Sequence, residues 1–174
     1  MTTYVWHVLP FNVPRWIRNY YVGQFVRYLK NIHAEYPDRE ISVIAHSFGG
    51  WIMEQAIRDL DFPIRTIVYV HCPISAHIEH SFYHSWLSSG KIQKVVSWSS
   101  HNDFVIGRIA LPPFGQNGYY GFIRSDFPDD RERPAEKPYH DIELYNRHSS
   151  EDHSGILNNI EVYGNEIAES IWRF

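Results

Sequence analysis

The stretch from Glu40 to Leu60 constrains the fold more than any other part of this chain. It reads EISVIAHSFGGWIMEQAIRDL, an apolar and β-branched run that stops at a polar turn. A helical pattern begins within a few residues. The order is therefore strand, sharp turn and helix, with Ser47 at the turn. Because Ala45 and Gly49 lie two residues to either side, only small side chains flank a hydroxyl raised above the end of a buried strand.

Strand-like and helix-like segments alternate along the rest of the chain. This alternation predicts an α/β fold with a mainly parallel sheet of about five or six strands flanked by helices, in one domain spanning residues 1–174. The expected strands are Tyr4–Leu9, Ile41–Ile44, Arg65–Val70, Lys91–Trp98 and Tyr139–Asn146, and the expected helices are Arg15–Ala34, a helix from Trp51, part of Ile74–Ser89 and a last helix from His153 to about Trp172. Gly and Pro predict a loop or short hairpin over Ile109–Phe122, and Asp126–Pro138 is expected to be solvated.

Composition and charge exclude several classes of partner. The formal net charge of −4 gives no electrostatic argument for nucleic acid or for an anionic membrane surface. The single cysteine, Cys72, excludes an intrachain disulfide framework. The sequence offers neither an apolar run long enough to span a bilayer nor a signal-peptide pattern at its N-terminus. We therefore expect a soluble, cytoplasmic protein with no transmembrane segment.

The turn around Ser47 resembles the nucleophile elbow of α/β-hydrolases, whose motif is G-x-S-x-G, with Ala45 in place of the first glycine. In such an elbow a strained backbone points the nucleophile outward, and the residues two positions away come too close to be large. The resemblance implies that Ser47 is the nucleophile and that the N–H of Phe48, at the positive end of the next helix, binds an oxyanion. It also implies that His46 and Phe48 contact the substrate.

The same resemblance implies an acid and a base later in the chain, in the order Ser, Asp or Glu, His. Sites in parallel sheets form at the carboxyl ends of strands, and Asp103 and His153 each follow a predicted strand. We therefore expect His153 to act as general base and Asp103 to orient it. The alternatives are a turn or capping role for Asp103, and His148 or His140 as the base.

Taken together, these motifs resemble a small serine hydrolase of the lipase or esterase type. The implied activity is cleavage of a small-molecule carboxylic ester through an acyl-enzyme, without a cofactor or metal. Members of the superfamily take a second oxyanion donor from a loop after an earlier strand, often marked by His-Gly, a pair that this sequence lacks. If Tyr4–Leu9 is that strand, the donor is the N–H of Phe11 or Asn12. If it is not, the alternative is an impaired or non-catalytic hydrolase-fold binding protein without a complete oxyanion hole.

Two further segments carry weaker signals. His77, His80 and His84 are spaced to share one face of a helix, but neither HExxH nor paired CxxC spacing is present, so a polar helix face is favoured over a metal site. The aromatic stretch Phe114–Phe122 either walls an apolar substrate site or packs as a loop.

Overall fold

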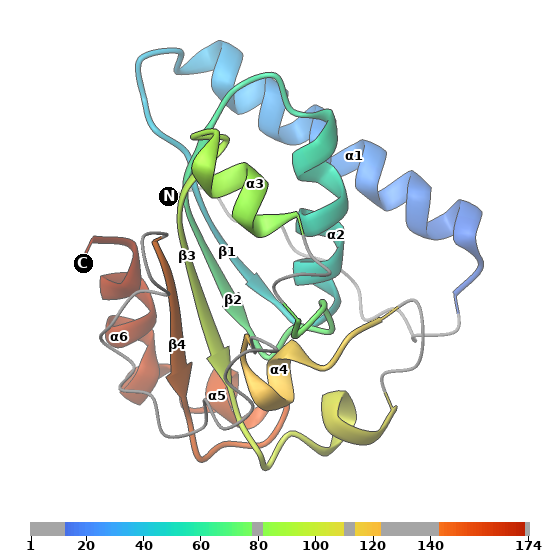
Figure 1. Cartoon of the computed structure of the whole chain (residues 1–174), viewed down its shortest axis with the longest axis vertical. Coiled ribbons are helices and arrows are strands. Elements are labelled where there is room, and N and C mark those ends of the chain that lie inside the picture. Colours follow the sequence, from blue (N-terminus) through green and yellow to red (C-terminus); the bar gives the residue numbers. More distant parts are fainter. Residues whose placement is uncertain (1–12, 78–81, 110–113, 123–142, 173–174) are drawn as a thin grey trace.

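Four parallel strands form one sheet in the part of the chain that the computed structural model describes, residues 13–77, 82–109, 114–122 and 143–172. They are β1 (Ser42–His46), β2 (Ile64–Val70), β3 (Ile92–Ser99) and β4 (Leu144–His148), in the spatial order β1-β2-β3-β4. His46 is in register with Val70, Val70 with Trp98 and Trp98 with Arg147. The carboxyl ends of all four strands therefore reach the same edge, at the bottom of Figure 1.

Helices cover both faces of this sheet (Figure 1). One face packs against α1 (Arg15–Glu35), against α2 (Phe48–Ala56) with its 3₁₀ extension Ile57–Asp59, and against α3 (Tyr83–Ser88). The other face packs against α5 (Gly155–Asn158) and α6 (Ile160–Trp172). The π-helical turn Val105–Ile109 and the short helix α4 (Asn117–Tyr120) follow β3.

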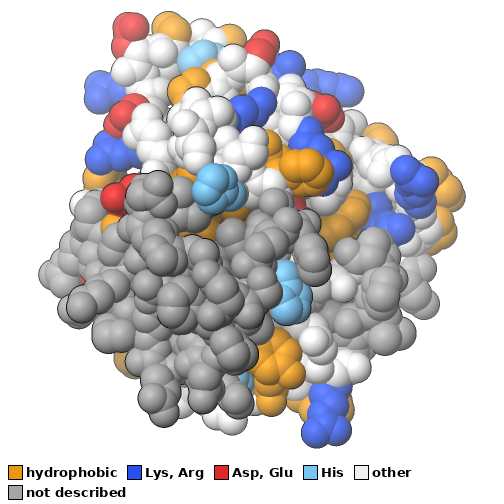
Figure 2. All heavy atoms as spheres, in the orientation of Figure 1, with side chains coloured by type: hydrophobic (Ala, Val, Ile, Leu, Met, Phe, Trp, Pro, Cys, Tyr) orange, Lys and Arg blue, Asp and Glu red, His pale blue; other side chains and the backbone are white. Residues whose placement is uncertain are grey.

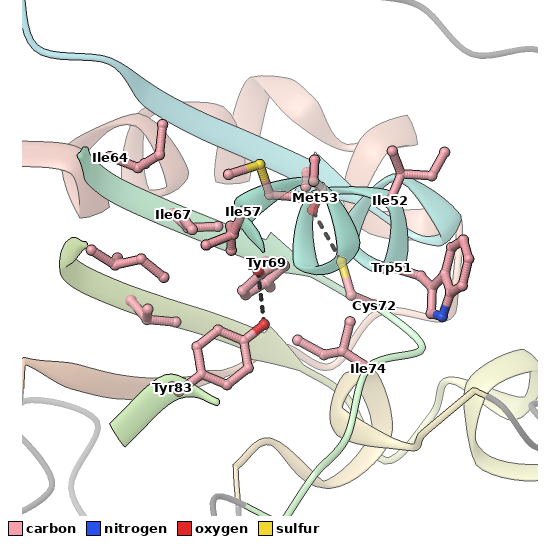
Figure 3. Close-up of a cluster of buried hydrophobic side chains, with 14 of the residues drawn as sticks. Trp51, Ile52, Met53, Ile57, Ile64, Ile67, Tyr69, Cys72, Ile74 and Tyr83 are labelled. Carbon is pink, nitrogen blue, oxygen red and sulfur yellow. Dashed lines mark hydrogen bonds between the residues drawn. The ribbon is translucent and has the colours of Figure 1, made fainter. Parts of the chain in front are cut away.

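The central strands are buried on both faces because alternate side chains enter two different cores. Ile67 and Tyr69 of β2 belong to the cluster under α1–α3, whereas Val68 and Val70 belong to the cluster under α5 and α6. Figure 3 shows the larger cluster, in which the hydroxyl of Tyr83 donates to that of Tyr69 at 2.8 Å. Continuous apolar strands of this kind are typical of parallel sheets.

The predicted fold class is confirmed, with fewer strands than expected in the described residues. Tyr4–Leu9 and Asp126–Pro138 lie outside them, and β4 ends two residues beyond the predicted strand. The last helix was predicted as continuous, but Asn159 separates α5 from α6. Asn158 and Asn159 are poor helix formers because their side chains compete with the backbone for hydrogen bonds, which accounts for the interruption.

The expected loop or hairpin at Ile109–Phe122 is wrong for Asn117–Tyr120, which form α4. Asn117 is fully buried, accepts a hydrogen bond from the hydroxyl of Ser97 at 2.6 Å and donates its N–H to Ile74. These tertiary contacts override the local preference for a loop.

The three histidines that were spaced to share a helix face do not do so in the described residues. His77 lies before α3 and His84 lies within it, and His80 lies outside the described residues. Among the helices described, none has the length and apolar character needed to cross a membrane.

Candidate active site

Ser47 occupies a strained turn between β1 and α2. Its φ of 52° and ψ of −131° lie in a region that non-glycine residues rarely adopt. Its N–H donates to the carbonyl oxygen of Val70 at 3.0 Å, which anchors the turn to the end of β2. A residue held in this way stores about 1–3 kcal/mol of strain, and such residues cluster at functional sites. The backbone therefore has the form expected for a nucleophile elbow.

The tightest contact behind this turn is made at Gly50. A Cβ at this position would lie 2.3 Å from the sulfur of Cys72 and 2.5 Å from its Cβ. Cys72 is fully buried, and its thiol donates to the carbonyl oxygen of Ala45 at 3.2 Å. Burial raises the pKa of this thiol well above its usual range, so Cys72 is a packing residue rather than a nucleophile. Sequence reasoning considered Ala45 and Gly49 and missed this second glycine.

His153 joins Ser47 to Asp103 through two short hydrogen bonds. Its Nε2 lies 2.8 Å from the hydroxyl oxygen of Ser47, and its Nδ1 lies 2.9 Å from Oδ2 of Asp103. The three residues come from the turn after β1, the loop after β3 and the turn between β4 and α5. Segments separated by more than 100 residues are therefore brought together at the carboxyl edge of the sheet.

The two carboxylate oxygens of Asp103 have different partners. Oδ1 accepts the N–H of Ile106 at 2.9 Å and so caps the turn that follows, while Oδ2 faces His153. The side chain is fully buried. The capping role considered from sequence and the contact with a histidine therefore coexist in one residue.

His71 is a fourth member of this cluster, and sequence reasoning did not select it. It is fully buried with a φ of 49°, its Nδ1 lies 3.4 Å from Oδ2 of Asp103, and its Nε2 lies 3.1 Å from the hydroxyl oxygen of Ser149. Burial lowers the pKa of His71, opposed by the charge of Asp103. The signal that could have revealed it is its position directly after β2, at the same edge as the other site residues.

A metal ion is the other chemistry that this cluster could support. His71, Asp103 and His153 offer ligand atoms that lie within 4.8 Å of one another. The same Nδ1 atom of His153 hydrogen-bonds to Asp103, however, and must be deprotonated to ligate a metal. A metal at this position would therefore replace the hydrogen bond that orients His153.

His46, which is expected to contact the substrate, holds the backbone of His153. Its Nε2 donates to the carbonyl oxygen of His153 at 3.0 Å, and the two rings are 5.3 Å apart. Burial lowers the pKa of His46 to about 4. A neutral imidazole with its proton on Nε2 satisfies this contact at neutral pH.

The other predicted site residues are only partly described. Phe48 is the first residue of α2, so its N–H belongs to the first turn, where N–H groups have no intrahelical acceptor. Its ring stacks on Trp51 at 5.4 Å and meets Phe114 edge-on at 5.9 Å. His148 contacts Ser99 through its Nδ1, at 2.8 Å, rather than Ser47. Phe11, Asn12 and His140 lie outside the described residues.

Comparison with known proteins gives one family. A family model described as "Alpha/beta hydrolase of unknown function (DUF900)" matches residues 7–99, which include Ser47, all of α2 and the first three strands. The match is more than half of the 174 residues. Among curated proteins, no match to the chain was found.

Proposed function

The chain belongs to this family of alpha/beta hydrolases of unknown function, and from that premise we propose that it is a serine hydrolase that cleaves carboxylic esters. The observation that carries the proposal is the continuous hydrogen-bonded chain from the hydroxyl of Ser47 through the imidazole of His153 to the carboxylate of Asp103. The strained backbone of Ser47 supports the same conclusion, because this strain is characteristic of a nucleophile elbow.

In the proposed first step, the Oγ of Ser47 attacks the acyl carbonyl carbon while Nε2 of His153 takes the hydroxyl proton. The imidazolium that forms is stabilised by Asp103, whose Oδ2 accepts the proton-bearing Nδ1. The C–O bond to the alcohol then breaks, and His153 returns the proton to the leaving oxygen. Water attacks the acyl-enzyme by the same sequence, releasing the acid and regenerating Ser47.

The oxyanion of each tetrahedral intermediate accepts the N–H of Phe48 in this proposal. The positive end of α2 favours the negative charge at that point. We propose the N–H of Phe11 as the second donor. Loss of one such donor reduces kcat by roughly a hundredfold to a thousandfold, so a hydrolase with one donor is slow but follows the same mechanism.

A fluorophosphonate probe tests the nucleophile directly, since it forms a covalent bond only with an activated serine. We expect the wild-type protein to be labelled and the Ser47→Ala variant to be unlabelled. Ser85→Ala is the matched control, because Ser85 is exposed on α3, and it should be labelled at the wild-type rate. A short-chain 4-nitrophenyl ester provides the corresponding turnover assay.

Absence of labelling in the wild type, together with no turnover of the ester, would contradict the proposal. The same fold would then be assigned to a non-catalytic binding protein. Labelling that persists in Ser47→Ala would instead move the nucleophile to another residue.

We further propose that the protein acts in the cytoplasm, a location compatible with the single unpaired and buried Cys72.

A further inference from the structure

A cavity of about 660 Å³ lies between α1 and α2. Its walls include Arg15 and Arg18 from α1, Trp51 and Arg58 from α2 and its 3₁₀ extension, and Asp59. This volume falls in the range of small-molecule binding sites. The catalytic steps proposed above make no use of it.

The charge of this cavity is strongly positive for a chain whose net charge is −4. Three guanidinium groups and one carboxylate line it, which leaves a formal charge of +2. Within the described residues, none of these arginines takes part in an ion pair closer than 4.0 Å. Figure 2 shows Lys and Arg side chains, with a few Asp and Glu among them, over the upper part of the molecule, where α1 lies in Figure 1. Arginine forks bind carboxylate and phosphate oxygens in pairs, so the cavity is suited to an anion.

Arg18 is held in place by aromatic rings rather than by acids. Its guanidinium carbon lies 5.3 Å from the ring centroid of Trp51 and 5.4 Å from that of Phe114. Its Nε is buried and has no hydrogen-bond partner in the described part of the chain. Stacking on rings fixes the plane of the guanidinium and keeps its donors available.

The same rings connect the cavity to the proposed active site. Phe48, the residue after Ser47, stacks on Trp51 at 5.4 Å, and Trp51 lies beneath Arg18. An α-helix rises about 1.5 Å per residue, so Trp51 and Gln55 lie about 6 Å and 12 Å along the axis from Ser47. A group bound beside Trp51 or Gln55 would therefore lie about 6–12 Å along the helix from a carbonyl at Ser47.

We propose that this cavity binds an anionic group, a carboxylate or phosphate, on the substrate at about 6–12 Å from the scissile ester. This inference rests on the proposed serine hydrolase activity and adds the substrate class to it: the preferred esters carry a terminal negative charge. An acyl chain of about eight carbons spans that interval, which makes the monoester of a linear dicarboxylic acid a suitable probe.

The test compares the 4-nitrophenyl monoester of suberic acid with the neutral 4-nitrophenyl nonanoate. We expect the wild type to favour the anionic ester by roughly 10- to 100-fold in kcat/KM, the size of one hydrogen bond to a charged group. Arg18→Met, which keeps the apolar stem, should bring the ratio close to one, and Arg15→Gln, at an exposed position, should lower it. Arg27→Met is the matched control, since Arg27 is exposed on α1 outside the cavity, and it should keep the wild-type ratio.

Direct binding separates failure of the cavity from failure of the hydrolase. Calorimetric titration of Ser47→Ala with suberate should give binding that Arg18→Met, added to that variant, abolishes. Competition by inorganic phosphate would extend the site to phosphates, and its absence would restrict the site to carboxylates. Equal kcat/KM for both esters, a ratio unchanged in both arginine variants, or no binding of suberate would overturn the inference. If neither ester is cleaved but suberate binds through Arg18, the hydrolase proposal fails and with it the substrate role of the cavity, whereas anion binding by the cavity stands.

Discussion

Replacing Gly50 by alanine tests whether α2 must approach the end of β2 as closely as the structure indicates. The new Cβ would lie 2.3 Å from the sulfur of Cys72 and 3.1 Å from Cδ1 of Tyr69. Both neighbours are fully buried, so neither can move without displacing the core. Overpacking of this kind costs about 1–3 kcal/mol, whereas alanine gains up to about 1 kcal/mol in helix propensity. We expect Gly50→Ala to lower the free energy of unfolding by about 1–2 kcal/mol.

Gly23 provides a matched control because the chemical change is the same and the surroundings differ. It is an exposed residue within α1, and a Cβ there would have no heavy atom within 4 Å outside its own helix backbone and chain neighbours. Gly23→Ala should therefore raise the free energy of unfolding by about 0.5–1 kcal/mol. Urea denaturation followed by circular dichroism would measure both variants, and the two midpoints should move in opposite directions at a constant m-value.

A double variant identifies the clash as the cause. Cys72→Gly removes both atoms nearest to the new methyl group, so Gly50→Ala should cost less in that background than in the wild type. The same displacement of α2 should also slow labelling of Ser47 by the fluorophosphonate, since Phe48 would move with the helix. If Gly50→Ala instead stabilises the protein as Gly23→Ala does, the reasoning about the close approach is refuted.

Three further predictions concern polar groups in or beside the core. Asp103→Asn keeps an acceptor for the N–H of Ile106, so the fold should be preserved while kcat falls by roughly 10⁴-fold. Ester turnover measures this loss. An unchanged rate would move the orienting role to another carboxylate. Burial raises the pKa of the Glu54 carboxyl from 4.5 to about 7 in the folded protein. As the pH rises, the unfolded chain therefore loses the Glu54 proton before the folded chain does, and the free energy of unfolding falls between pH 4.5 and about pH 7. Glu54→Gln should therefore be more stable than wild type at pH 8, by about 1–3 kcal/mol in urea denaturation, and an equal or lower stability would contradict this. Tyr83→Phe removes the hydrogen bond to the hydroxyl of Tyr69 and should lower the free energy of unfolding by about 1 kcal/mol in the same assay. An unchanged free energy of unfolding would mean that this hydrogen bond makes no net contribution to stability.

Local patterns were sufficient to predict the strained turn and the elements around it. The run before Ser47 and the helix after it are read from a few neighbouring residues, and the structure has them at β1 and α2. The contact of Gly50 with Cys72 joins two elements and depends on how α2 docks on the sheet. Sequence periodicity carries no information on that distance, which explains why Gly50 was not considered. The position of His71 directly after β2 places it at the same edge of the sheet, but its contact with Asp103 depends on the order of the strands.

Strand order also decides which histidine reaches Ser47. Neighbouring strands are about 4.8 Å apart, so the end of β4, three strands from β1, is about 14 Å from it. His148 is the last residue of β4 and contacts the adjacent strand through Ser99. His153 comes five residues later, and five extended residues span up to about 17 Å, enough to return across β3 and β2. A histidine at the strand end is therefore too far away, and the base must come from the loop beyond it. By the same argument Asp103, which approaches from β3, needs a shorter loop, and it lies four residues after that strand ends.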